Sequence, residues 1–161
     1  MARIPPIVKR FHVTTDEGLR KILESRALKP YMNAQTMYDN NGMALRDENG
    51  HIIHEDRLRP VFTSTPSAKN DWSGNGRTRK LFIEFPKERY LQFKRTDVNP
   101  DYPSAVQRKG LGTPYNVMSV DRGGYADLFM EDIPLEFVKK ICLDGNRDCY
   151  DVETLLKEYV K

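Results

Sequence analysis

The segment RFHVTTDEGLRKILESRALKP, residues 10–30, places a histidine and two threonines where a β-like run meets a helical pattern. An imidazole ring can donate or accept a hydrogen bond near neutral pH, so a histidine at such a joint can hold a polar ligand. Taken alone, His12 is better explained as a histidine that is satisfied at the end of a strand. Its chemistry therefore depends on the residues that accompany it.

A second candidate segment, YADLFM at residues 125–130, contains the carboxylate of Asp127. Alternate residues of a strand share a face, so Asp127 is expected to lie between Tyr125 and Phe129. A charge between two aromatic rings is partly desolvated. Because this desolvation costs free energy, such a charge is more often found where the group has a function. The alternative is an edge-strand aspartate that is bonded to a backbone amide or paired with Arg122, and both interpretations stay open.

Two basic runs, GRTRK and KERYLQFKR, place cations and aromatic residues close together. Cations contact phosphates and aromatic rings stack on bases, so these runs favour contact with DNA or RNA. A solvated strand edge explains them equally well. The candidate nucleic-acid residues are Arg77, Arg79, Lys80, Lys87, Arg89, Lys94 and Arg95, with Tyr90 and Phe93 among them.

His51 and His54 have a spacing that binds metal when it occurs on a helix. Here they follow an Asn-Gly turn, and strand geometry would put them on opposite faces, so a solvated hairpin is the better interpretation. The chain also has no phosphate-binding glycine loop and no set of cysteines that suits zinc. We expect no metal.

Local patterns predict the elements that must position these residues. Thr14 with Glu17 forms a capping box, so a helix should begin there and end near Ser25. The Asn-Gly pair predicts a hairpin at about 43–55. Residues 87–124 look irregular and partly exposed, interrupted by short strands, and segments of that kind are often functional. Strands are predicted in IVKRFHVT, PVFTST, RKLFIEFP and YADLFM, a short turn and strand in IPLEFVKKICL, and a closing helix in DVETLLKEYVK.

Composition limits the class of protein. A chain of 161 residues with 39% hydrophobic residues supports one core, so we expect a single domain over residues 1–161. Strands outnumber helices without βαβ alternation, which predicts an α+β fold with a mostly antiparallel sheet. The chain lacks an apolar run of the ~20 residues that a membrane span needs, and its N-terminus lacks the apolar centre of a signal peptide. We therefore expect a cytoplasmic monomer with no membrane partner, in which Cys142 and Cys149 are free thiols rather than a disulfide.

The opening of the chain resembles the first strand and helix of the ADP-ribosyltransferase superfamily. The resemblance rests on the pattern aromatic-His-x-Thr at residues 11–14, followed by the glycine, leucine and isoleucine positions of the helix. It implies that His12 holds the adenosine-side ribose of NAD, that the backbone of Val13 holds the nicotinamide amide, and that Thr14 belongs to the same site. The His-x-Thr opening is most similar to the DarT-type branch, which modifies nucleic acid, and to the tRNA 2′-phosphotransferases.

Two further blocks extend this resemblance over most of the chain. VFTSTPSAKNDW is similar to the second block, with Ser64 and Thr65 at a small-residue turn and Trp72 at the position whose ring stacks on nicotinamide. YADLFMEDIPLEFVKKI resembles the third block, in which the catalytic carboxylate would be Asp127. The implied fold has split antiparallel β-sheets with a few short helices, and NAD is the implied co-substrate.

The chain departs from the family at the catalytic position, where the family has glutamate and this chain has the shorter aspartate. Glu131 is nearby, but it stands at a turn that would point it away from the cleft. Two hypotheses follow. The first is an NAD-consuming transferase that places ADP-ribose on a macromolecule, with nucleic acid preferred to protein. The second is a non-catalytic module that binds a nucleotide or nucleic acid on the same fold, and an NAD-using RNA 2′-phosphotransferase is a further alternative.

Overall fold

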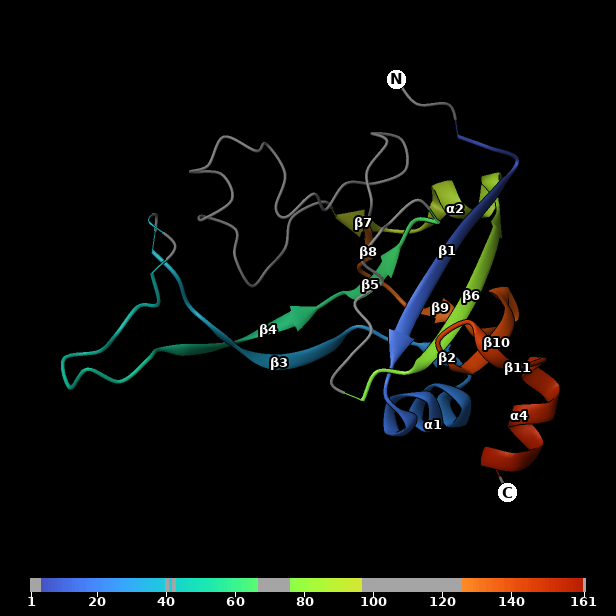
Figure 1. Cartoon of the computed structure of the whole chain (residues 1–161). Coiled ribbons are helices and arrows are strands. Elements are labelled where there is room, and N and C mark those ends of the chain that lie inside the picture. Colours follow the sequence, from blue (N-terminus) through green and yellow to red (C-terminus); the bar gives the residue numbers. More distant parts are fainter. Residues whose placement is uncertain (1–3, 40, 42, 67–75, 97–125, 161) are drawn as a thin grey trace.

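The structure, a computed structural model of the chain, describes residues 4–39, 41, 43–66, 76–96 and 126–160. A seven-stranded sheet with the order β11-β10-β6-β1-β5-β8-β7 forms its centre (Figure 1). Each of its strand pairs is antiparallel. The strands are β1 (Ile7–Thr14), β5 (Val61–Ser64), β6 (Arg79–Pro86), β7 (Arg95–Thr96), β8 (Ala126–Phe129), β10 (Val138–Asp144) and β11 (Arg147–Tyr150).

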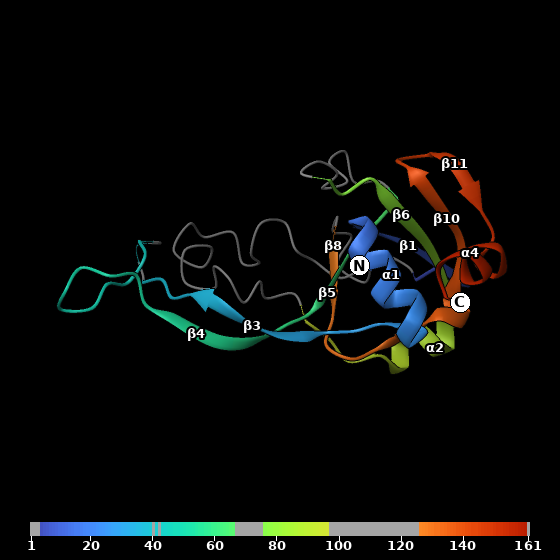
Figure 2. The same cartoon turned by 90° about the horizontal axis from the view of Figure 1, so that it is seen from below.

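Two small antiparallel sheets accompany the large one, which confirms the predicted α+β class with split sheets. β2 (Ala27–Leu28) pairs with β9 (Ile133–Pro134) and ties the end of the first helix to the segment after β8. β3 (Tyr31–Thr36) pairs with β4 (His54–Arg59) in a long arm that projects from the body (Figures 1 and 2). The predicted turn around Gly50 lies in this arm, between the bridged residues Arg46 and Ile52.

The helices α1 (Asp16–Ser25), α2 (Lys87–Gln92) and α4 (Val152–Tyr159) and the short 3-10 helix η3 (Leu135–Phe137) complete the fold. The apolar residues Leu19, Ile22 and Leu23 of α1 are buried, because they pack against the core strands. α1 and α4 lie side by side, and the Tyr159 hydroxyl donates to Asp16 Oδ1 at 2.7 Å. Within the described ranges, none of the helices has the length and apolar character to cross a membrane.

The strand-to-helix joint at residues 14–16 differs in detail from its prediction. The N-cap of α1 is Thr15, whose hydroxyl accepts a hydrogen bond from the Gly18 N–H at 3.0 Å, whereas Thr14 is the last residue of β1. The predicted end of the helix at Ser25 is confirmed. Gly18 is needed because a Cβ at this position would overlap the Thr14 hydroxyl oxygen.

Two further expectations were wrong where the structure describes the chain. Residues 87–92, expected to be irregular, form α2, because Tyr90 anchors this short helix in the core, whereas β7 agrees with the short strands that were expected in this segment. Cys142 and Cys149, expected to be free, form a disulfide. The reason is that β10 and β11 make a tight hairpin in which the two cysteines lie directly opposite each other.

Candidate functional site

The three blocks of the sequence pattern come together on adjacent strands of the sheet. β1 carries His12, β5 carries Ser64 and β8 carries Asp127, and these strands are neighbours in the order β1-β5-β8. The register pairs Phe11 with Ser64, and Thr63 with Asp127. Positions that are more than 50 residues apart in the sequence are therefore a few strand spacings apart in space.

His12 is half-buried, and its ring has a defined orientation. Its Nδ1 lies 2.6 Å from the backbone oxygen of Phe62 on β5. A carbonyl oxygen can only accept, so Nδ1 carries the proton and donates this bond. Burial lowers the pKa of His12 below its ordinary value of 6.5, and the nearby Arg77 charge lowers it further, against the bond to Phe62. The neutral ring therefore keeps Nε2 as an acceptor for a ligand hydroxyl.

The lowered pKa of His12 predicts a dependence of stability on pH. Below about pH 6.5, His12 is protonated in the unfolded chain but stays largely neutral in the folded chain, because its pKa is lower there. The free energy of unfolding therefore falls as the pH falls through this range. The loss is about 1.4 kcal/mol for each pH unit that separates the two pKa values. We expect His12→Gln to reduce the difference in unfolding free energy between pH 7.5 and 5.5, as measured by urea unfolding. His54→Gln, on the exposed arm, is the control, and equal differences in both variants would contradict this assignment.

Asp127 lies at the centre of a buried polar network. Its Oδ2 accepts hydrogen bonds from the Tyr90 hydroxyl at 2.5 Å and from Arg10 Nε at 3.2 Å. Arg95 Nη1 donates to the same Tyr90 hydroxyl at 2.7 Å and lies 4.0 Å from Asp127 Oδ1. The side chains of Asp127 and Arg10 are 0% and 2% exposed. β8, β1, α2 and β7 thus each contribute one member to a network in which Asp127, Arg10 and Tyr90 are buried and Arg95 is partly exposed.

The two carboxylate oxygens of Asp127 have different surroundings. Oδ2 carries both hydrogen bonds, whereas the buried Oδ1 accepts none within the described part of the chain. Burial raises the pKa of Asp127 above its ordinary value, although Arg10, the Tyr90 hydroxyl and Arg95 all act to lower it. A buried polar atom without a partner needs an explanation, and a ligand hydroxyl is one. His12 lies on the same face of β1 as Arg10, so His12 and Asp127 face the same side of the sheet.

The other residues that were expected to bind NAD are divided between the two faces of the sheet. Thr14 shares the face of His12, whereas Val13 and Ser64 lie on the opposite face, because they alternate with His12 and with Thr63, the residue that pairs with Asp127. Val13 and Thr14 are half-buried at the end of β1, Ser64 is buried at the end of β5, and Thr65 is buried directly after it. The Thr63 hydroxyl donates to the backbone oxygen of Asp127 at 2.8 Å, which fixes β5 against β8. Trp72, Arg122 and Tyr125 lie outside the described residues.

The candidate nucleic-acid residues do not gather on one edge. Arg79 and Lys80 lie at the start of β6. The other end of β6 leads into α2, which carries Arg89, and then to Lys94 and Arg95. Arg79 contacts Asp16 at 3.2 Å, and Arg89 lies 3.9 Å from Glu136. Arg77 and Lys94 are exposed. The two interleaved aromatic residues pack inward, with Tyr90 fully buried and Phe93 against the core, so neither ring offers a face to a base.

Sequence reasoning missed Arg10 and Tyr90, the two closest partners of Asp127. Arg10 stands in a strand whose alternation places it on the core face, two residues before His12, and a buried arginine requires an anion. That alternation was the available signal. The identity of the anion, 117 residues away, was not available from local pattern.

Among the residues described, no three histidine, cysteine, aspartate or glutamate side chains are grouped so that they could hold a metal ion. No protein-family model, curated protein or solved structure matches the chain.

Proposed function

We propose that this chain is an NAD-dependent ADP-ribosyltransferase that moves ADP-ribose from NAD to a macromolecular acceptor, with nucleic acid preferred to protein. The observation that carries the proposal is the convergence of the three sequence blocks on β1, β5 and β8. It brings a neutral histidine with an available acceptor nitrogen to the same sheet face as a buried carboxylate.

The proposed reaction breaks the bond between the nicotinamide nitrogen and C1′ of the ribose. Nicotinamide leaves with the electron pair, positive charge develops on the ribose, and an acceptor nucleophile forms the new bond to C1′ and loses its proton. A fixed negative group near the ribose hydroxyls stabilises this charge most effectively where water is excluded. Asp127 is the candidate for this role because its Oδ1 has no hydrogen bond in the described structure. His12 Nε2 would accept a hydrogen bond from a ribose hydroxyl.

Glu131 is less suited to the catalytic role. It is exposed in the turn after β8, and its Oε1 accepts a hydrogen bond from the Lys94 backbone N–H at 2.8 Å. This contact holds the carboxylate at the end of β7. Asp127 lies on the neighbouring β8, and His12 lies on β1, two strands beyond β8.

A second candidate is a module that binds a nucleotide or nucleic acid without turnover. The full burial of Asp127 and its contact with two arginines favour it, because a carboxylate that neutralises buried cations is less available to a developing charge. This candidate binds a nucleotide or nucleic acid and differs from the first in the absence of nicotinamide release.

The test is to incubate the full chain with NAD and to measure free nicotinamide, with and without single-stranded DNA, RNA or a protein mixture. We expect release that increases with nucleic acid. His12→Ala should weaken NAD binding by about 1–3 kcal/mol in calorimetric titration, since it removes a hydrogen bond to the ligand. His54→Ala, on the arm, should leave it unchanged. Binding without release would support the second candidate, and the absence of both would overturn the NAD site.

A further inference from the structure

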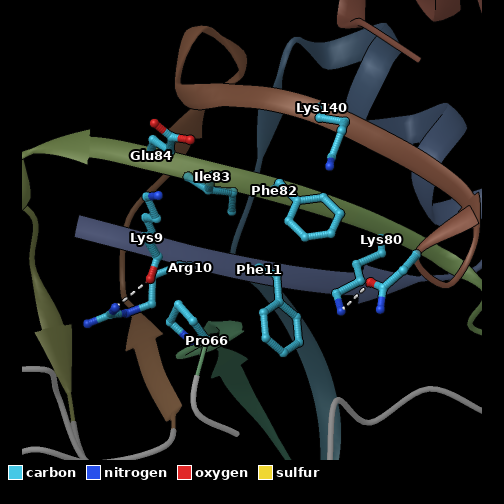
Figure 3. Close-up of a pocket in the computed structure, with 10 residues that line it drawn as sticks. Lys9, Arg10, Phe11, Pro66, Lys80, Phe82, Ile83, Glu84 and Lys140 are labelled. Carbon is cyan, nitrogen blue, oxygen red and sulfur yellow. Dashed lines mark hydrogen bonds between the residues drawn. The ribbon is translucent and has the colours of Figure 1, made fainter. Parts of the chain in front are cut away.

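A shallow hollow of about 460 Å³ lies on the sheet face that points away from the core (Figure 3). It crosses β1, β6 and β10. Its walls include two phenylalanines and three lysines, Phe11, Phe82, Lys9, Lys80 and Lys140. This face is distinct from the one that carries His12 and Asp127, because it is formed by the alternate residues of the same strands.

The register of the sheet produces this arrangement. Phe11 on β1 lies directly opposite Phe82 on β6, and Phe82 lies opposite Lys140 on β10. One step along the face, Lys9 lies opposite Glu84. The aromatic rings are thus adjacent across neighbouring strands, and the cations flank them.

The lysines are held close to the rings. Lys80 Nζ lies 4.2 Å from the centre of the Phe11 ring and 5.2 Å from that of Phe82, and Lys140 Nζ lies 4.5 Å from the Phe82 ring (Figure 3). Lys80 is only 7% exposed, and its Nζ donates to Asn146 Oδ1 at 2.9 Å. Lys140 is exposed at the rim of the hollow. One cation is therefore fixed inside the site and another stands at its edge.

A third cation and ring lie further along the same face. The Arg59 guanidinium lies 4.9 Å from the centre of the Phe62 ring on β5. Phe62 belongs to this face because it is two residues from Ser64, which pairs with Phe11. Half-buried Phe62 and Phe82 lie on either side of β1. The combination of aromatic ring and cation thus repeats across β5, β1 and β6.

We propose that this face binds single-stranded nucleic acid, with a base stacked on Phe82 and neighbouring phosphates in contact with the exposed Lys9 and Lys140, while the buried Lys80 adds positive charge beneath them. Rings spaced along a sheet stack successive unpaired bases, and cations beside them neutralise the backbone. A duplex hides its base faces, so the face selects single strands. The proposal goes beyond ADP-ribosyl transfer, since it requires neither NAD nor His12 or Asp127.

The experiment measures binding of a fluorescently labelled 12-nucleotide single strand to the full chain by polarisation, without NAD, at 50 and 200 mM salt. Phe82→Ala should weaken binding about tenfold or more through loss of stacking. Lys140→Glu should weaken it by a similar factor and flatten the dependence on salt. Lys157→Glu on α4 is the matched control, since it makes the same change in net charge at an exposed position on another element, and it should change affinity less than threefold.

Three results would overturn the proposal. The wild-type chain could fail to bind at 50 mM salt, Lys140→Glu and Lys157→Glu could weaken binding equally, or a duplex of the same sequence could bind as tightly as the single strand. Circular dichroism of Phe82→Ala checks its fold, and Lys140→Glu provides the same test at an exposed residue that the core does not need. Because NAD is absent, failure here leaves the proposed transferase activity untouched.

Discussion

Replacing Asp127 with asparagine is expected to lower the free energy of unfolding by about 3 kcal/mol, and the reason is Arg10. The Arg10 side chain is 2% exposed and its Nε is paired with Asp127 Oδ2. Asparagine keeps the shape of the side chain but removes the negative charge, which leaves a buried guanidinium uncompensated. Urea unfolding at pH 7.5 measures this loss, and a change below about 1 kcal/mol would contradict it.

The same substitution should lower nicotinamide release at least tenfold under the proposed function, with little change in NAD affinity, because the charge acts mainly in the transition state. Stability and catalysis are separated by the double variant Arg10→Met with Asp127→Leu. Removing both charges of a buried pair often restores stability, so this variant should be more stable than Asp127→Asn and should still release nicotinamide at least ten times more slowly than the wild-type chain. Glu131→Gln is the control for activity. If Glu131→Gln were inactive and Asp127→Asn fully active, the catalytic carboxylate would be Glu131 and not Asp127.

Replacing Phe85 with alanine is expected to cost about 3–5 kcal/mol of stability. Phe85 is 0% exposed on β6, and its ring centre lies 5.1–5.9 Å from four other rings. The four rings are those of Tyr90 on α2, Phe93 directly after it, Phe129 on β8 and Phe137 in η3. A truncation here leaves a cavity that these fixed elements cannot close.

Phe82 provides the matched comparison for Phe85, since it stands three residues earlier on the same strand but on the other face. Phe82→Ala should cost less than about 2 kcal/mol, because the side chain is only half-buried. Thermal and urea unfolding of the two variants should therefore differ clearly. Equal losses would mean that Phe82 belongs to the core and not to an accessible face.

Local pattern was sufficient for most of the elements. The strands around His12, Phe62 and Phe85 and the helix ending at Ser25 were predicted, because alternation, capping and apolar spacing act within a few residues. The Asn-Gly turn likewise predicted its hairpin. α2 was missed because six residues are too few for a helical period to show, and its stability comes from Tyr90 in the core.

The sequence by itself determined which residue types were available to a site, namely a histidine at a strand end, a carboxylate in an apolar strand and cations beside aromatic residues. Only the tertiary structure decided their partners. Register placed Arg10 against Asp127, paired Cys142 with Cys149 and set Phe82 beside Lys140. The physical reason is that strand pairing joins residues far apart in the chain, and its energy comes from the whole sheet and core rather than from any local segment.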